Sequence, residues 1–453
     1  MDRTIGVPQP DTIVALASGP GLAAIAVIRV SGPRTRDALE AFCGGVPPPR
    51  HAALRDIGPP RASKLDRGLV LFFSAPASFT GEDMAELQLH GSRAVTRAVI
   101  DALLTLPGIR LAEPGAFARR AFENGKLDLT EVEGLADLIA AETEAQRGQA
   151  LAQSEGSLRR LYEGWRADLL GAQALMEAGL DFADEADVAT DVSVKAGAIV
   201  AVLLDSIARH LADNRGERLR DGVRIVIAGP PNAGKSSLLN ALAKRDVAIV
   251  SEEAGTTRDV IEVHLDLAGI PVILTDTAGI REAQGKVEEA GIERALARVE
   301  DADLVLWMVD ATAPVWSAPL DVRGAKGGQV WTTGGQVCVL NKIDLATVAS
   351  GPDRIEISAK TGAGVDRLIA ALAARAAQLA ETGTGSPLMT RARHRTELER
   401  AQAALDRFGD SSLSPELKAE ELRIAARHLG RLTGHIDVEE VLGAIFAEFC
   451  IGK

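Results

Sequence analysis

Cysteine is scarce in this chain of 453 residues, which contains only Cys43, Cys338 and Cys450. Three cysteines so far apart cannot form a disulfide framework, and their spacing does not match that of metal ligands. Such sparse cysteine usage is typical of proteins that work in a reducing cytosol.

Long hydrophobic runs are also missing. The sequence has no stretch of about 18 apolar residues, so we expect no membrane-spanning helix. The uncharged stretch 12–28 follows Asp11 instead of a basic region, and Gly19, Pro20 and Gly21 interrupt it, which argues against a signal peptide. We therefore expect a soluble, cytoplasmic protein without a membrane partner.

Basic residues are too few to give the chain a positive charge. Lys and Arg total 50 against 63 Asp and Glu, a net charge of −13. So acidic a chain does not bind nucleic acid with its whole surface, and any contact with RNA needs a local basic patch or a partner protein. With 46% hydrophobic and 25% charged residues, the composition is that of a globular protein of about three domains.

The first 124 residues have the pattern of an α+β domain. Short apolar runs at 25–30 and 69–73 predict strands, and the spacing over 93–106 predicts a helix. The proline-containing stretch 44–61 predicts a loop. We expect a first domain over residues 1–124.

Two helical stretches flank an α/β unit further along the chain. Apolar residues recur at helical spacing over 125–220 and again over 381–453. Over 221–380, apolar runs alternate with helical patterns, which is typical of a parallel sheet wrapped by helices. Because each helical stretch has one apolar face to cover, we expect the two to pack together with the α/β unit inserted. The predicted fold is multidomain, α+β and α/β.

A glycine-rich segment at residues 229–236, GPPNAGKS, fits the phosphate-binding pattern GxxxxGK(S/T). It follows the predicted strand 223–228 and precedes a helical pattern at 237–242, which is the context this motif requires. In such a loop, backbone N–H groups surround the phosphates at a helix N-terminus. Lys235 would place a positive charge on the outer phosphates, and Ser236 would offer its hydroxyl to Mg²⁺.

A second element, DTAG at residues 276–279, follows another apolar run. This context puts Asp276 at a strand end where it can hold Mg²⁺, and the N–H of Gly279 where it can meet the γ-phosphate. The next residue is Ile280, where Ras-type enzymes have a Gln that orients the attacking water. An apolar side chain cannot do this, so another side chain, a cation or a second protomer must arrange hydrolysis.

A third element, NKID at residues 341–344, follows the apolar run 337–340. The Asp344 carboxylate can accept the two N–H groups that guanine presents and adenine does not, so the site would reject ATP. The segment SAK at 358–360 supplies a backbone contact to the guanine oxygen. The order of the three elements, each at a strand end, predicts a GTPase domain.

Further motifs make the chain similar to a known family. The string GTTRD at 255–259, together with Asn232 and Ile280, resembles the TrmE/Era class of GTPases. Motifs from residue 11 to the last residue resemble, in order, the MnmE (TrmE) family of tRNA uridine-modification GTPases: DTIV at 11–14, RVSG at 29–32, FTGED at 79–83, KLDL at 126–129 and FCIGK at 449–453. The likeness therefore covers essentially the whole chain.

The resemblance implies an N-terminal domain that binds a tetrahydrofolate derivative and mediates homodimerisation, and a split helical domain that carries the GTPase domain. It implies an FAD-dependent partner, MnmG, in a heterotetramer, and tRNA as substrate. The family adds an aminomethyl or carboxymethylaminomethyl group at C5 of the wobble uridine, using a folate one-carbon unit. Potassium-dependent dimerisation of the GTPase domains activates hydrolysis in this family.

Residue roles carry over at the matching positions. The resemblance implies K⁺ contacts from Asn232, Ser251, Glu253 and Thr256. It adds Thr257 to Ser236 as a ligand of Mg²⁺. It implies folate contacts from Arg29, Glu86, Lys126 and Lys453, which by sequence alone are ordinary surface charges.

The resemblance also assigns Glu288 as the water-orienting catalytic residue beside Lys235. By sequence alone, Glu288 lies in a run of carboxylates that is typical of a solvated helix face. The complete set of expected GTP contacts comprises Asn232, Ala233, Gly234, Lys235, Ser236, Ser237, Ser251, Thr256, Thr257, Asp276, Thr277, Ala278, Gly279, Asn341, Lys342, Asp344, Ser358, Ala359 and Lys360.

Two other functions compete with a tRNA-modifying GTPase. An Era-like ribosome-assembly switch would carry an RNA-binding domain with a GXXG loop after the GTPase unit, and the C-terminal helical stretch has no such loop. A scaffold that had lost turnover would not need Lys235, Ser236, Thr257 and Asp276 together. The sequence favours the enzyme.

Overall fold

The computed structural model describes residues 11–19, 21–59, 63–181, 186–249, 262–276, 302–313, 335–346, 354–380, 387–436, 439–447, 449 and 452. The chain divides into two compact units, which we describe separately. The first combines Met1–Ala136 with Gly430–Lys453, and the second is Asp137–Leu429.

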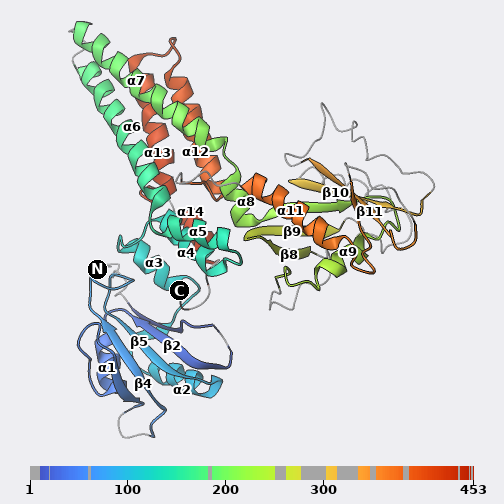
Figure 1. Cartoon of the computed structure of the whole chain (residues 1–453). Coiled ribbons are helices and arrows are strands. Elements are labelled where there is room, and N and C mark those ends of the chain that lie inside the picture. Colours follow the sequence, from blue (N-terminus) through green and yellow to red (C-terminus); the bar gives the residue numbers. More distant parts are fainter. Residues whose placement is uncertain are drawn as a thin grey trace, which may run out of the picture. The chain divides into compact units, whose positions relative to one another are not determined.

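The first unit is built on a six-stranded sheet with strand order β3-β4-β5-β2-β1-β6. Its strands are β1 (Thr12–Leu16), β2 (Ala23–Ser31), β3 (Ala53–Ile57), β4 (Asp66–Phe73), β5 (Met84–Gly91) and β6 (Ile109–Leu111). All neighbours are antiparallel except β1 and β6. Two helices, α1 (Thr35–Cys43) and α2 (Arg93–Leu103), bury their apolar sides against one sheet face. Figure 1 shows this unit with its sheet in blue.

The opposite face of this sheet is more polar and partly open. Arg29 and Glu86 stand next to each other on β2 and β5. At the β3–β4 edge, Leu54 and Leu69 are direct cross-strand partners with exposed fractions of 57% and 38%. No described residue covers these two leucines, so this part of the face is accessible apolar surface.

The C-terminal residues of the chain belong to this first unit. Helix α14 (Glu439–Ala447) packs with α3 (Ala116–Glu123) and α4 (Leu129–Ala140) in a small apolar core. Gly115 and Gly452, both at positive φ, lie so close to the backbones of Phe446 and Leu16 that neither has room for a side chain. Gly452 thereby places the C-terminal tail against the end of β1.

The second unit contains a helical bundle, the long helices of Figure 1. Its members are α6 (Ser157–Asp181), α7 (Ala186–Leu211), α12 (Ala392–Phe408) and α13 (Pro415–Thr433), and the shorter α5 (Glu144–Ser154) packs beside α6. Inside it, the Tyr162 ring lies 5.8 Å from His210 of α7 and 6.0 Å from His394 of α12. Burial, with nearby His394, lowers the pKa of His210 to about 4, so this core histidine is neutral at pH 7. Helices from both sides of the α/β region thus share one core, as predicted.

The α/β region has a sheet with order β12-β11-β10-β7-β9-β8, parallel except for the β8–β9 pair. The strands are β7 (Val223–Ala228), β8 (Glu262–Leu267), β9 (Ile270–Asp276), β10 (Leu304–Asp310), β11 (Gln336–Asn341) and β12 (Ile355–Glu356). Helices α9 (Lys235–Leu242) and α11 (Val365–Ala380) pack on one face. The short α8 (Arg215–Asp221) leads from the bundle into β7.

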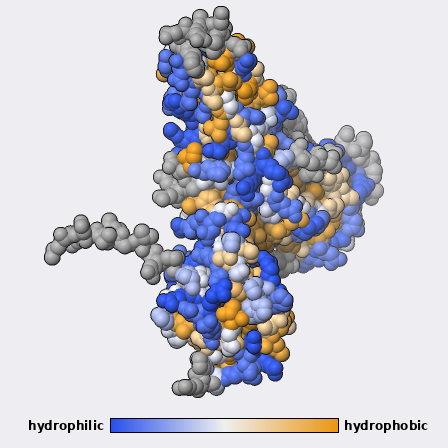
Figure 2. All heavy atoms as spheres, turned by 90° about the vertical axis from the view of Figure 1, so that its left-hand side faces the viewer, coloured by the Kyte–Doolittle hydropathy of each residue, from blue (hydrophilic) through white to orange (hydrophobic). Residues whose placement is uncertain are grey.

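The predicted fold class and strands are confirmed, with one error. β3 lies inside the stretch 44–61 that we expected to be a loop, because prolines surround the strand without entering it. The linker at 381–386 lies outside the described residues, and the exact domain boundaries stay a prediction. Figure 2 shows apolar patches on a largely polar surface; on the bundle, the exposed large apolar residues include Leu170, Val194 and Val202.

Candidate nucleotide site

The nucleotide motifs gather at one edge of the second sheet. Strands β7, β9, β10, β11 and β12 are parallel, so their carboxyl ends meet at this edge. Ligands of open α/β sheets bind outside the carboxyl ends of the strands. The three motifs at 229–236, 276–279 and 341–344 each begin at or directly after such an end.

Two glycines of the phosphate loop are required by close packing. Gly229, at φ 144°, lies against the Met308 carbonyl oxygen, and Gly234, at φ 96°, lies against the Asn341 side chain. A Cβ at either position would collide with these atoms. Asn232 also has a positive φ, 62°, which an Asn tolerates better than most residues. The loop conformation therefore depends on these residue types.

Lys235 is the first residue of α9 and is nearly buried, with 8% exposed. Its ammonium group donates hydrogen bonds of 3.0 Å to the carbonyl oxygens of Gly229 and Pro230. The loop thus holds the Lys235 ammonium group at the N-terminus of α9, where a phosphate would bind.

Ser236 and Asp276 face each other across the loop and the end of β9. The Ser236 hydroxyl donates a 2.6 Å hydrogen bond to Oδ2 of Asp276, which is 3% exposed. A hydroxyl and a carboxylate oxygen at this separation fit the hard oxygen ligands that Mg²⁺ prefers. These two residues could hold the ion, with water and phosphate oxygens completing its shell.

Asn341 connects the phosphate loop with the base-side loop. Its amide donates 2.8 Å to the Ala233 carbonyl oxygen, and its Oδ1 accepts a 2.9 Å bond from the Ala359 N–H. Nearby, the Ser358 hydroxyl donates 2.7 Å to Oδ1 of Asp344. Asp344 itself is exposed, so its other oxygen can receive a ligand. One buried amide therefore fixes the distance between the two halves of the site.

Asp310, at the end of β10, is a site residue that the sequence analysis missed. Its carboxylate forms a 2.6 Å ion pair with the Lys342 ammonium group. The backbone of Lys342 has a positive φ of 67°. Burial acts to raise the pKa of Asp310, but hydrogen bonds from Lys342 and Thr312 outweigh it and hold the pKa below its ordinary value. Lys342 is oriented by this carboxylate, and only the pairing of β10 with β11 reveals the contact.

The other described residues of the predicted GTP set lie in the phosphate loop, in the first turn of α9 and in the segment after β12. Ala233 is buried beneath the phosphate loop, while Ser237 and Lys360 are exposed. Several predicted residues fall outside the described residues: Ser251, Glu253, Thr256, Thr257, Thr277, Ala278, Gly279, Glu288 and Lys453.

A second group of predicted residues lies in the first unit. Arg29 donates two hydrogen bonds, of 3.1 and 2.8 Å, to Oε1 of Glu86, and both side chains are about one-fifth exposed. The Arg29 guanidinium also lies 5.7 and 5.8 Å from the ring centres of Phe79 and Phe117. The pair is therefore sheltered between aromatic rings, which strengthens it relative to an exposed ion pair.

Lys126 contacts the same loop that supplies Phe79. Its ammonium donates a 3.2 Å bond to the Pro76 carbonyl oxygen, and its side chain packs at Gly81. The C-terminal tail comes to this sheet at Gly452. Arg29 and Glu86 contact each other directly. Lys126 contacts only the loop that carries Phe79, whose ring lies beside Arg29.

A partly buried network behind this loop was not predicted. Arg120 bonds to Glu82 at 2.8 Å and to Asp11 at 2.6 Å, and the Ser31 hydroxyl bonds to both Glu82 and Thr80. It ties the FTGED motif at 79–83 to α3 and β2. These contacts join residues far apart in the sequence, so no local pattern could reveal them.

The described residues include neither a metal-holding cluster nor a membrane-spanning helix. Among them, no group of three or more His, Cys, Asp and Glu side chains is arranged to hold a metal ion. None of the described helices is long and apolar enough to cross a membrane.

The parallel sheet, the phosphate loop with its buried lysine, the Ser–Asp pair and the guanine-type motif joined by Asn341 define a P-loop GTPase. Comparison with known proteins specifies the family. The model of the MnmE helical domain matches residues 129–450, and that of the GTP-binding protein TrmE N-terminus matches residues 12–126.

Curated relatives match over nearly their full length. A protein of Parvibaculum lavamentivorans, named tRNA modification GTPase MnmE, is 56% identical over 98% of this chain and 100% of its own. Proteins of the same name from Rhodopseudomonas palustris and Brucella melitensis are 52% and 51% identical, covering 98% of this chain and 100% and 98% of theirs. The chain belongs to the MnmE family of GTPases.

Among solved structures, Era of Aquifex aeolicus with GDP and AlF4⁻ is 25% identical, covering 42% of this chain and 69% of that chain, with a TM-score of 0.25. A TM-score this low supports no inference about shared architecture.

Proposed function

We propose that this chain is a GTP-hydrolysing enzyme of tRNA modification. In this proposal it works with the FAD-dependent partner MnmG to add an aminomethyl or carboxymethylaminomethyl group at C5 of the wobble uridine. Two findings together support it most. The described nucleotide site has the Ser236–Asp276 pair and the Asn341 link between its two loops, and full-length relatives are named tRNA modification GTPase.

Each step of the proposed GTP binding and hydrolysis has a physical basis. Lys235 neutralises the outer phosphates, and Asp344 accepts the guanine N–H groups. Ser236 and Asp276, with Thr257, hold Mg²⁺, which spreads negative charge away from the transferred phosphoryl group. Glu288 orients the attacking water, the task that Ile280 cannot perform.

A potassium ion is the proposed substitute for an arginine finger. Asn232 would contact it from the phosphate loop, with Ser251, Glu253 and Thr256 from the following loop. A cation bound beside the phosphates supplies charge that an arginine supplies elsewhere. Dimerisation of GTPase domains would enclose it.

The sheet of the first unit is the proposed site for a tetrahydrofolate derivative. Glu86 offers a carboxylate to the N–H edge of a pterin, and Arg29, Lys126 and Lys453 offer positive charge to its acidic tail. Figure 1 shows the N-terminal sheet of this unit in blue. The exposed Leu54 and Leu69 offer apolar area to a second copy in a homodimer.

The proposal is tested by mass spectrometry of tRNA nucleosides from the source organism with and without this gene. We expect the C5 aminomethyl-type group at the wobble uridine to disappear in the deletion. An unchanged nucleoside profile would refute the modification role, and a ribosome-assembly defect in the same strain would then favour the Era-like alternative.

A further inference from the structure

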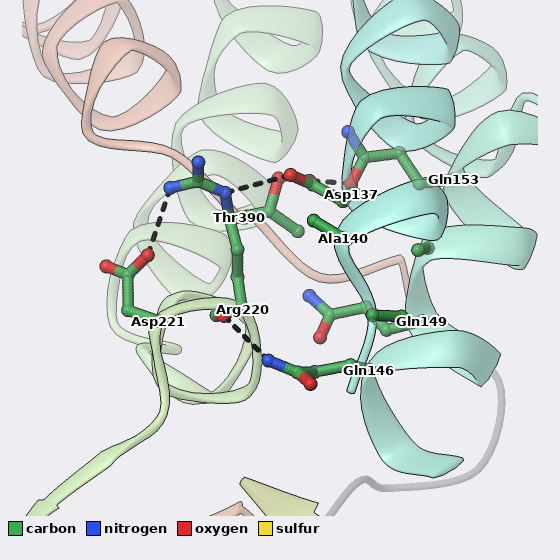
Figure 3. Close-up of a pocket in the computed structure, with 10 residues that line it drawn as sticks. Asp137, Ala140, Gln146, Gln149, Gln153, Arg220, Asp221 and Thr390 are labelled. Carbon is green, nitrogen blue, oxygen red and sulfur yellow. Dashed lines mark hydrogen bonds and ion pairs between the residues drawn. The ribbon is translucent and has the colours of Figure 1, made fainter. Parts of the chain in front are cut away.

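The chain enters and leaves the α/β region at one place in the second unit. It enters through α8 and returns through the segment at 387–391. Figure 3 shows α5 beside both passages, bordering a cleft of about 130 Å³. Its lining includes the polar side chains of Asp137, Gln146, Gln149, Gln153, Arg220 and Thr390.

Three glutamines on one face of α5 contact both α8, where the chain enters the α/β region, and the returning segment at 387–391. Residues 146, 149 and 153 are spaced three and four apart, so they share a face of the helix. In order, they bond at 3.0 Å each to the Arg220 carbonyl oxygen, the Gly216 carbonyl oxygen and the Thr390 hydroxyl. The first two partners lie on the entering passage and the third on the returning passage.

Asp137 joins the same passages through charge. Its Oδ1 accepts 3.0 Å from Nε of Arg220 and 2.8 Å from Nη2 of Arg391. Asp137 and Arg391 are only 14% and 9% exposed, so removing the carboxylate charge would weaken the compensation of Arg391, while Arg220 keeps its ion pair with Asp221. The Asp137 carboxylate therefore fixes the distance between α8 and the returning segment at 387–391.

The N-terminal end of α5 also contacts the nucleotide-binding sheet. The Ala145 N–H donates a 3.1 Å bond to the Gly269 carbonyl oxygen, in the turn between β8 and β9. Strand β9 then runs without interruption to Asp276 in the nucleotide site. One unbroken strand therefore joins Asp276 to the turn that contacts α5.

The contact zone contains a polar atom that its neighbours leave unsatisfied. Gln149 Oε1 is buried and has no hydrogen-bond partner among the described residues. The cleft beside it has a volume of about 130 Å³. Polar groups beside such a cleft can exchange hydrogen bonds at lower cost than groups in a packed apolar core.

We propose that α5, together with Asp137, couples the nucleotide site to the helical part of the chain. In this role Asp137 and Gln149 are positioning residues: they hold α8 and the returning segment in register with the β8–β9 turn. GTP hydrolysis would change this register, and the change would reach the bundle through α5. The inference rests on the proposed function, because the coupled event is tRNA modification.

The first experiment does not depend on tRNA. Hydrogen–deuterium exchange of the full chain is measured with GDP and with a non-hydrolysable GTP analogue. We expect the amides of α5 and α8 to change protection with the nucleotide, and the Asp137→Asn variant to lose that change. Nucleotide-dependent exchange confined to the nucleotide loops would overturn the proposal, whatever the protein does to tRNA.

The second experiment separates coupling from folding. With its FAD-dependent partner, Asp137→Asn should modify tRNA about 10-fold more slowly while GTP affinity and basal hydrolysis stay within about twofold. Asp137→Glu should restore modification, and Asp205→Asn, in an exposed pair with Arg209, is the matched control. Parallel loss of hydrolysis and modification, or no loss of either, would overturn the proposal. A wild-type protein that modifies no tRNA would refute the proposed function alone, and the exchange experiment would still decide the coupling.

Discussion

The nucleotide site and the Arg29–Glu86 pair differ in what their polar groups do without a ligand. In the nucleotide site, backbone at strand ends aims Lys235, Ser236 and Asp276 at the place where a ligand would lie. In the first unit, Arg29 and Glu86 satisfy each other. In the nucleotide site, Lys235 is held by carbonyl oxygens of its own loop and Ser236 by Asp276, whereas Arg29 and Glu86 form a pair of opposite charges.

This difference predicts different responses to substitution. A change in the nucleotide site removes a contact with the ligand together with a local bond, such as that from Ser358 to Asp344. A change in the Arg29–Glu86 pair leaves a charged partner without compensation, so a larger part of the effect arises before any ligand binds.

The largest effect is expected at Glu288, for which we propose a role in hydrolysis alone. Glu288→Ala should lower the turnover of GTP by about 1,000-fold, as expected for loss of a group that positions the attacking water, with GTP affinity unchanged. Single-turnover hydrolysis and nucleotide binding measure the two quantities. Glu289→Ala, the neighbouring carboxylate, should be silent; equal turnover in Glu288→Ala and wild type would remove Glu288 from the mechanism.

The next effect concerns the guanine base. Asp344→Asn should weaken GTP binding by about 100-fold, because two hydrogen bonds to a charged group are lost, and should improve binding of xanthosine triphosphate. Competition binding with both nucleotides measures the exchange of preference. Asp366→Asn, an exposed carboxylate in the first turn of α11, serves as control. If preference does not change, Asp344 is not the base contact.

A smaller effect is expected in the first unit. Glu86→Gln keeps the shape of the side chain and removes its charge, so tetrahydrofolate binding should fall by about 10-fold. GTP affinity should not change. Calorimetric titration with a stable folate derivative provides the measurement, and Asp56→Asn on β3, with an exposed carboxylate, is the control. Undiminished folate affinity in Glu86→Gln would exclude this carboxylate from the site.

The smallest effect concerns the orientation of Lys342. Asp310→Asn should weaken GTP binding by about three- to tenfold, since a partly buried partner charge is lost. The pKa of Asp310 is lower in the folded protein than in the unfolded chain. The favourable interaction of its charge with Lys342 is therefore complete above the unfolded pKa and is lost only as the pH falls through the lower, folded pKa. The difference from wild type should therefore be equal at pH 5.5 and pH 8. A difference that vanishes at pH 5.5 would contradict this origin.

The sequence was most informative where function depends on neighbouring residues. The strand at 223–228 and the loop after it were predicted together, because an apolar run and a glycine pattern are both local. The Arg29–Glu86 contact depends on the register of two strands whose paired residues are 57 positions apart, and Asn341 reaches Ala233 across 108 positions. Such contacts follow from topology, which no local pattern specifies.

The same distinction explains the missed elements. β3 alternates partly buried and exposed residues over only five positions between prolines, so its signal is weak. Arg120 and Asp137 look like ordinary surface charges in the sequence. Each has its partners only after distant segments pack together.

The central claim is that GTP hydrolysis in this chain drives chemistry on tRNA. The most direct test is a reconstituted reaction of this protein, its FAD-dependent partner, a folate one-carbon donor and unmodified tRNA, with GTP or a non-hydrolysable analogue. We predict that the C5-modified wobble uridine forms with GTP and not with the analogue. Equal product with the analogue, or without any nucleotide, would contradict the account.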